Sequence, residues 1–218
     1  MTVGHSRNSQ HSHHPAPAQP LVAVYADESC LGNGREGDNP GGAGALIEFR
    51  KTGGELVRRD LWISEPATTN NRMALRSVID SFQALSAKDR AFRVVFTSDS
   101  RYLVDGMREW VHGWAARGWT RKSGPIENLE LWRDAIRAAS RHTVEWRWVR
   151  GHAGHPQNEY ANDLATRAAA DMSTSGGLVE SGFGTWLEAH RSKGKMGADL
   201  AAFPEADAFR AARPLPTV

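Results

Sequence analysis

A short apolar run at residues 21–26, Leu-Val-Ala-Val-Tyr-Ala, places the strongest constraint on how this chain folds. A nearly continuous apolar run of this length is typical of a central strand that is covered on both faces. The run leads directly into Asp27 and then into a turn rich in Gly and Asn. Side chains that follow such strands gather at one rim of a layered α/β sheet, where these folds commonly bind ligands. The sequence therefore predicts an α/β fold with Asp27 at the end of a central strand.

Further segments complete the predicted sheet and its helices. Thr52-Gly53-Gly54 is a hairpin signal between two strand-like stretches, and two later stretches have the same character. These four strands are expected at residues 45–50, 55–63, 92–97 and 143–149. Apolar residues recur at helical spacing after Asn70, a good N-cap, and three more helices are expected over 102–114, over 128–139 and from His155-Pro156 onward. The expected order is βββαβααβα, with five strands in the sheet and helices flanking it.

The length of 218 residues suits one domain of ~150 residues with flanking segments. We expect that domain over residues 21–172. Residues 1–20 carry almost no apolar side chains, so they cannot bury enough surface to offset their ordering entropy and are expected to form a disordered arm. Residues 173–218 are expected to hold a linker, one short helix around Trp186 and a flexible tail.

Composition indicates the cellular compartment and limits the class of binding partner. The lone Cys30 rules out an intramolecular disulfide framework and fits a reducing compartment. No apolar run is long enough for a membrane span and no signal-peptide segment is found, so we expect a cytoplasmic monomer with no membrane partner. The net charge is only +2, so any footprint for nucleic acid must be local.

Two aspartates are the candidate metal ligands. Asp27 and Asp99 each close a predicted strand, and the two strands are expected to be neighbours. Carboxylate oxygens are the ligands that Mg²⁺ and Mn²⁺ prefer, and two such ions can stabilise both oxygens of an in-line phosphodiester displacement. Structural roles are the alternative: Asp27 as a turn-forming residue and Asp99 as a helix N-cap.

The motifs around these aspartates, in this order and spacing, resemble those of the type 1 ribonuclease H family. The motifs are Tyr25-Ala26-Asp27-Glu28-Ser29, Thr68-Thr69-Asn70-Asn71-Arg72-Met73-Ala74, Thr97-Ser98-Asp99-Ser100, and the segment from Gly151 to Glu159. The resemblance covers roughly residues 21–172. It implies a ribonuclease H-like fold and divalent-metal-dependent cleavage of the RNA strand of RNA–DNA hybrids. It also implies that the loop residue His152 carries protons in the reaction, the alternative being a solvated surface histidine.

The chain departs from the family pattern at two positions. Ala74 stands where the family has a Glu, and Asn162 where it has an Asp, so the cluster falls from four carboxylates to two with Asn162 as a weak neutral ligand. Glu28 occupies a position that is usually Gly and is the candidate substitute. Successive strand residues point to opposite faces, so we expect Asp27 and Glu28 to converge only if the strand is broken there. Glu159 and Asp163 are weaker candidates for compensation.

The residues that the resemblance assigns to the substrate are better preserved. Short amides can bond 2′-hydroxyls and base edges in the shallow groove of a hybrid, and aromatic residues interleaved with cations suit contact with the DNA backbone. The minor-groove residues are Asn33, Asn70 and Asn71, Thr69 is a DNA-phosphate contact, and the basic protrusion contributes Trp110, Trp114, Arg121 and Lys122. The structural alternative for residues 68–71 is a loop with a helix cap. For the Trp side chains of the protrusion it is packing between helices.

The favoured function is therefore endonucleolytic cleavage of the RNA strand of RNA–DNA hybrids, assisted by Mg²⁺ or Mn²⁺ and reduced by the changes at Ala74 and Asn162. The alternative is a degenerate module of the same fold that binds hybrid or double-stranded RNA without cutting it.

Overall fold

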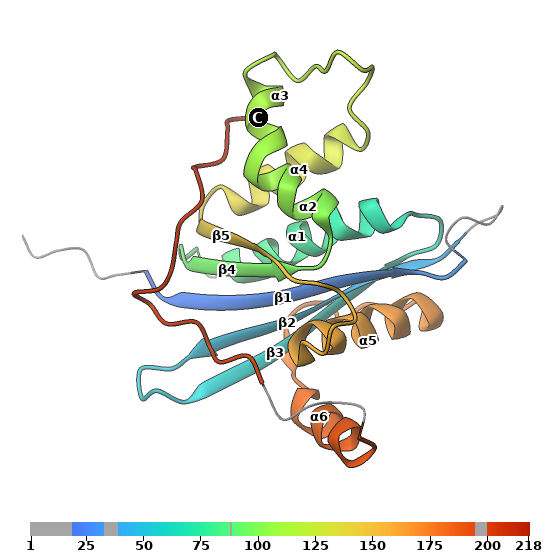
Figure 1. The fold of residues 1–218 in the computed structure, drawn as a ribbon, viewed down its shortest axis with the longest axis vertical. Helices are drawn as coiled ribbons and strands as arrows, with labels where there is room; N and C mark the ends of the chain where they lie inside the picture. Colours follow the sequence, from blue (N-terminus) through green and yellow to red (C-terminus); the bar gives the residue numbers. More distant parts are fainter. Residues whose placement is uncertain (1–18, 33–38, 88, 195–199) are drawn as a thin grey trace, which may run out of the picture.

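The computed structural model describes residues 19–32, 39–87, 89–194 and 200–218 as one sheet with helices on both faces (Figure 1). The strands are β1 (Leu21–Cys30), β2 (Gly41–Arg50), β3 (Leu56–Glu65), β4 (Arg93–Ser98), β5 (Thr143–Trp148) and β6 (Val179–Glu180). They lie in the order β5-β4-β1-β2-β3-β6. The sheet is mixed, because β1 pairs in parallel with β4 and in antiparallel with β2.

The two faces of the sheet are covered by different helices. Figure 1 shows α1 (Asn70–Ser86) and α4 (Leu129–Ala139) on one side, and α5 (Pro156–Asp171) with α6 (Phe183–Ser192) on the other. Strand β1 is buried on both faces because its side chains alternate: Val22 and Val24 enter the first core, and Ala23 and Tyr25 enter the second. The predicted central strand and the predicted α/β class are confirmed.

One strand was not predicted, and one predicted helix is interrupted. The sheet has six strands in the described part of the chain, because the two-residue β6 pairs with Arg59 and Asp60 of β3. The predicted helix over 102–114 is a continuous run of α2 (Arg101–Asp105), a π-helical turn η1 (Gly106–Trp110) and α3 (Val111–Ala115). A single two-residue strand carries no hydrophobic alternation, so the sequence pattern could not show β6.

A glycine on β2 sets how closely α5 approaches the sheet. A Cβ at Gly44 would overlap the carbonyl oxygen of Ala161 in α5, so a larger residue would push the helix away from the strand. Gly44 pairs with Asp27 across β1 and β2. The close approach therefore brings the α5 side chains next to the acidic end of β1.

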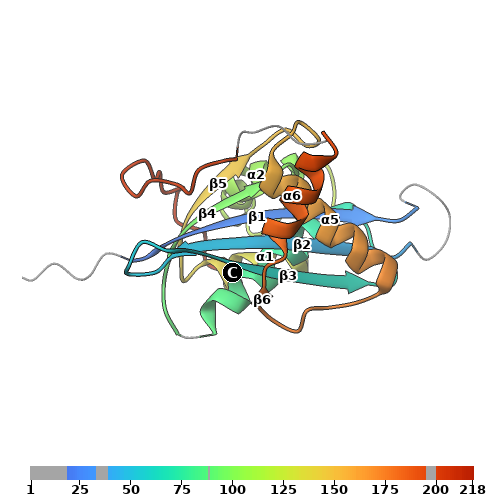
Figure 2. The same ribbon diagram turned by 90° about the horizontal axis from the view of Figure 1, so that it is seen from below.

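The segment after α5 packs on the domain. The predicted short helix around Trp186 is α6, and Figure 2 shows it lying beside α5. Residues 200–218 run along the sheet and past β5 toward α3 (Figure 1). Ala212 N donates to Val144 O at 2.8 Å, and Phe203, 9 % exposed, joins the core under α5. The tail thus bonds to the edge strand β5, and its predicted flexibility stays a prediction. The predicted arm at residues 1–20 lies almost wholly outside the described residues.

No helix among the described residues is both long and apolar enough to cross a membrane.

Candidate active site

Strand β1 continues past the end of its neighbour β4, and this overhang carries the acidic residues. The parallel pairing with β4 ends at Tyr25 and Thr97, whereas the pairing with β2 continues through Asp27 and Glu28 to Cys30. The prediction that the strand ends at Asp27 is therefore wrong, since the polar residues after Ala26 still pair with Gly44 and Ala43 of β2. The overhang leaves the β4 side of Asp27 and Glu28 without a strand neighbour.

Three carboxylates converge at this overhang. One ligand oxygen from each of Asp27, Glu28 and Asp99 lies within 4.8 Å of the others. The prediction that Asp27 and Glu28 converge only across a broken strand is wrong. Beyond the Tyr25–Thr97 pair no β4 residue pairs with β1, so the side chains of consecutive residues can meet around the open edge.

The crowded negative charge of the cluster fits a site that binds a metal cation. Burial and the neighbouring Asp99 raise the pKa of Asp27 to about 8. Burial and the charges of Asp27 and Asp99 also hold the pKa of Glu28 well above its usual value. The Oε2 atom of Glu28 is enclosed and has no hydrogen-bond partner among the described residues. Oxygen ligands, crowded negative charge and an unpartnered carboxylate oxygen all fit a hard divalent cation.

Asp27 is held in place by groups from two elements. Its Oδ1 accepts from the backbone N–H of Glu28 at 2.7 Å, and its Oδ2 accepts from Nδ2 of Asn158 in α5 at 3.1 Å. Asn158 is 2 % exposed. The sequence analysis missed Asn158. Its spacing of four residues from Asn162, which puts both on one face of α5, is the signal that could have found it.

Asp99 follows β4 and is fixed through its backbone and its neighbours. Its carbonyl oxygen accepts from the indole Nε1 of Trp148 at 2.9 Å. A Cβ at Gly151 would overlap Oδ2 of Asp99, so only glycine lets the loop before α5 come this close. Burial raises the pKa of Asp99, and the opposing charge of His152 lowers it.

The loop residue His152 borders a cavity of about 490 Å³. Its Nδ1 lies 3.7 Å from Oε2 of Glu159, and its side chain is 78 % exposed. Asn162 and Glu159 of α5 line the same cavity, as does Trp186 of α6. His155 is the N-cap of α5 and accepts from Asn158 N, as expected for a residue that sets the helix entrance.

The two other acids considered as substitutes lie apart from the three-carboxylate cluster. Asp163 pairs with Arg167 at 3.2 Å and lines the same cavity as His152. Glu159 faces His152 and acts on the cluster only through its charge, which raises the pKa of both Asp27 and Asp99. Among the candidate substitutes, Glu28 is the one whose oxygen joins the two aspartates.

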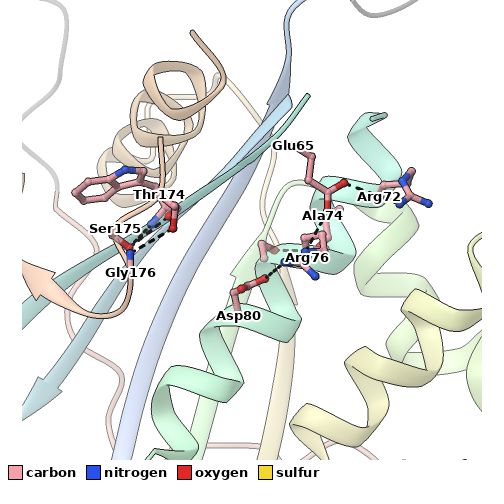
Figure 3. A network of polar contacts seen from close by, with 10 residues as sticks. Glu65, Arg72, Ala74, Arg76, Asp80, Thr174, Ser175 and Gly176 are labelled. Atoms are coloured by element: carbon pink, nitrogen blue, oxygen red, sulfur yellow. Dashed lines mark hydrogen bonds and ion pairs between the residues drawn. The ribbon is translucent and has the colours of Figure 1, made fainter. Parts of the chain in front are cut away.

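Ala74 lies fully buried in the core between α1 and the sheet. Its carbonyl accepts from the hydroxyl of Ser77, and ion pairs hold α1 to the end of β3 nearby (Figure 3). Arg76 contacts Glu65 at 3.3 Å and Asp80 at 3.4 Å, while Arg72 lies 3.9 Å from Glu65. The first turns of α1 are therefore fixed without a carboxylate at position 74.

The predicted substrate residues of α1 lie at the start of that helix. Thr69, not Asn70, is the N-cap, since its hydroxyl accepts from Arg72 N. The prediction of Asn70 as the cap is wrong by one residue, because Thr69 already has the extended backbone that a cap requires. Oδ1 of Asn70 is enclosed without a hydrogen-bond partner among the described residues, and Asn71 is partly exposed. Asn33 lies outside the described residues.

The predicted basic protrusion begins at Trp110, the last residue of η1. Trp110 is 38 % exposed, whereas Trp114 is 8 % exposed and packs against Trp132 at 5.5 Å between ring centres. Trp110, Trp114 and Arg121 line one cavity of about 320 Å³. Lys122 is exposed beside it. The structure thus brings three of these four residues together and gives Trp114 a packing role as well.

Comparison with known proteins identifies relatives over most of the chain. The RNase H family model matches residues 19–170. A ribonuclease H from Paramagnetospirillum magneticum is 42% identical over 158 residues, covering 72% of this chain and 95% of the relative. One from Aromatoleum aromaticum is 42% identical over 159 residues, covering 72% and 96%.

Solved structures agree with the fold. The structure of LC9-RNase H1, described as a type 1 RNase H with the type 2 active-site motif, is 63% identical with a TM-score of 0.86 and covers 92% of this chain and 95% of that chain. The PFV RNase H domain has the same fold at 18% identity, with a TM-score of 0.57, covering 71% and 97%. Taken with the acidic cluster at the open edge of β1, these matches show that the chain belongs to the ribonuclease H family.

Proposed function

We propose that Asp27, Glu28 and Asp99 form the catalytic centre with which this family member cleaves the RNA strand of RNA–DNA hybrids. The convergence of their three oxygens within 4.8 Å carries the proposal. Relatives over 95% of their own length are named as ribonucleases H, which favours cleavage over binding without cutting. LC9-RNase H1 combines the type 1 fold with another type of active-site motif, and the exchange of a family Glu at Ala74 for Glu28 is in line with such a combination.

Glu28 restores a third carboxylate to a cluster that would otherwise hold two. Mg²⁺ or Mn²⁺ is the expected cofactor, held by oxygens of Asp27, Glu28 and Asp99, with Asn162 as a weak neutral ligand on α5. When bound, such an ion activates the attacking water and neutralises charge on the phosphate. Asn158 keeps Asp27 oriented by its hydrogen bond to Oδ2. Gly151 leaves the space in which Asp99 can face the other two carboxylates.

His152 is proposed to move the proton of the attacking water or of the leaving oxygen. It sits on an exposed loop beside Asp99, and its Nδ1 lies 3.7 Å from Oε2 of Glu159. The cavity of about 490 Å³ in front of it gives a water molecule access to the imidazole. Exposure and left-handed backbone, φ 50°, fit a residue that moves toward the phosphate once substrate is bound.

Hybrid recognition is proposed to involve two surfaces. Asn70 and Asn71 at the start of α1 reach the minor groove and bond 2′-hydroxyls and base edges, with Thr69 close to a DNA phosphate. Trp110, Arg121 and Lys122 of the protrusion contact the DNA backbone.

The test separates cutting from binding. Asp27→Asn and Asp99→Asn should each abolish Mg²⁺- or Mn²⁺-dependent cleavage of an end-labelled hybrid while preserving the circular dichroism spectrum. Both variants should still bind hybrid in chelator, with affinity falling as salt rises. Asp134→Asn, which removes an exposed carboxylate of α4 that pairs with Arg137, is the matched control and should cleave normally. Undiminished cleavage by both aspartate variants would refute the assignment of the site.

A further inference from the structure

One exposed cation beside the cluster is held in a fixed orientation. The guanidinium carbon of Arg101 lies 4.0 Å from the ring centre of Trp148, and the indole Nε1 of Trp148 donates to the carbonyl oxygen of Asp99 at 2.9 Å. Trp148 ends β5 in register with Ser98, and Arg101 begins α2. Arg101 is therefore tied through one ring to the backbone of a proposed metal ligand.

The stacking is closer here than elsewhere in the described chain. The other five arginine–aromatic pairs are separated by 5.0 to 5.8 Å. Arg101 forms no ion pair with any carboxylate of residues 19–32, 39–87, 89–194 and 200–218, whereas Arg58 and Arg133 do pair with acids. A stacked guanidinium keeps its N–H donors free in the plane of the group, and these match phosphate oxygens in pairs.

Exposure of the Trp148 ring has no evident packing reason. The ring is 37 % exposed at the end of a strand, although a tryptophan there could be replaced by a polar residue without opening a core. Covering an aromatic face with an arginine stem is the plain structural explanation. That explanation accounts for the stack but not for a cation without an acid partner two residues after Asp99.

We infer that Arg101, stacked on Trp148, binds a phosphate of the RNA strand next to the scissile phosphate. The inference rests on the proposed function, since the scissile phosphate must lie at Asp27, Glu28 and Asp99 for its neighbour to lie near Arg101. The contact positions the strand and neutralises one backbone charge. Arg101 is thus a positioning residue and takes no part in proton transfer.

The first experiment measures that charge by salt dependence. Arg101→Ala should weaken hybrid binding in chelator about tenfold. It should also reduce the slope of log affinity against log salt by about one unit, because one phosphate contact no longer releases its counterion. In cleavage the KM should rise by a similar factor while kcat changes little. Arg101→Lys keeps the charge without the planar stack, so its affinity and KM should lie between those of Arg101→Ala and the unmodified protein.

Arg90→Ala is the matched control. Arg90 is also exposed and lies over an aromatic ring, Phe92, at 5.8 Å, but it stands just before β4, at the end of that strand opposite Asp99. It should change neither the slope nor the KM. Arg101→Gln, uncharged and of similar length, provides the same test if Arg101→Ala loses its fold.

A second experiment locates the phosphate. Hybrids carrying one uncharged methylphosphonate at successive positions of the RNA strand are cleaved, and each bond is read on a gel. At bonds adjacent to the methylphosphonate, the unmodified protein should cleave more slowly, by about the same factor as Arg101→Ala on normal hybrid. Arg101→Ala should not be slowed further by the methylphosphonate, because both changes remove the same contact. The same series in the DNA strand should leave the effect of Arg101→Ala intact.

The outcomes separate the inference from the proposed function. If the unmodified protein cleaves hybrid but Arg101→Ala and Arg101→Gln behave like Arg90→Ala, the phosphate contact is refuted and the catalytic centre stands. If the losses from the methylphosphonate and from Arg101→Ala fail to add only in the DNA-strand series, Arg101 binds the DNA strand and the inference is wrong. If the unmodified protein neither binds nor cleaves hybrid, the proposed function fails and the inference fails with it.

Discussion

Replacing Glu28 by Gln should abolish cleavage and at the same time stabilise the metal-free fold. The substitution keeps the shape of the side chain and removes one of three charges whose oxygens lie within 4.8 Å. Two unit charges at that distance repel by about 3.5 kcal/mol when the effective dielectric constant is about 20. The cluster relieves part of this repulsion by holding protons, as the raised pKa values of Asp27 and Glu28 show. We therefore expect the free energy of unfolding to rise by about 1–2 kcal/mol.

Two assays on the same protein test this prediction. Denaturant unfolding at pH 9 in chelator should give a higher midpoint for Glu28→Gln than for the unmodified chain, at an unchanged slope. Adding Mn²⁺ should stabilise the unmodified chain by about 2.7 kcal/mol at a hundred times its dissociation constant, and the variant by much less. Cleavage of labelled hybrid should fall by at least about a hundredfold, since an ion held by two carboxylates is poorly positioned.

Asp134→Asn serves as the control for losing a carboxylate elsewhere. Asp134 pairs with Arg137 on the exposed surface of α4, so neither the metal response nor cleavage should change. Glu28→Gln with normal cleavage, or with lower stability in chelator, would refute the reasoning. The first result would remove Glu28 from the metal site, and the second would show that its charge is stabilised by the fold.

Three further predictions follow from the site and its surroundings. Ala74→Glu with Asn162→Asp should raise cleavage less than about threefold in the unmodified chain, yet restore at least tenfold in Glu28→Gln, measured on the same hybrid. In chelator, stability should fall as pH rises from about 4 to 8, because the folded state, with the pKa of Asp27 at about 8, holds a proton that the unfolded chain has released. The loss should be at least about 1.4 kcal/mol and smaller in Asp27→Asn, in which the raised pKa values of Glu28 and Asp99 leave the remainder, as measured by urea unfolding at several pH values. Phe203→Ala should cost about 2 kcal/mol of unfolding free energy, because the ring is 9 % exposed against the core under α5, while leaving the KM unchanged.

The sequence predicted those parts of the fold that the spacing of apolar residues along the chain encodes. The run at residues 21–26 and the helical spacing after Asn70 each correspond to an observed element, because burial on two faces or on one stripe imposes those patterns. The strand β6 has no such pattern. The overhang of β1 beyond Thr97 is equally invisible, since it depends on where β4 stops, a property of two segments about 70 residues apart in the chain.

The site was predictable in its residue types but not in its geometry. Asp27 and Asp99 follow apolar runs, which is a local signal, and Glu28 stands out because it occupies a position that is usually Gly in the family. Alternation along a strand argued against the convergence of Asp27 and Glu28, and only the missing β4 neighbour reverses that argument. Trp148 acts through a bond to Asp99 that joins distant segments, so no local pattern indicates it, whereas Asn158 has a local signal only in its spacing from Asn162.

The position of the third carboxylate has a physical consequence for how this site binds metal. At Ala74 a carboxylate would extend from α1, whose first turns are held to β3 by the Glu65 ion pairs. Glu28 instead extends from the same strand as Asp27, one residue away, so two of the three charges are fixed by a single backbone segment. That segment is paired with β2 and packed beneath α5, which makes the spacing of the two charges hard to relax. The repulsion between Asp27 and Glu28 is therefore built into the fold, and a divalent cation is the partner that removes it.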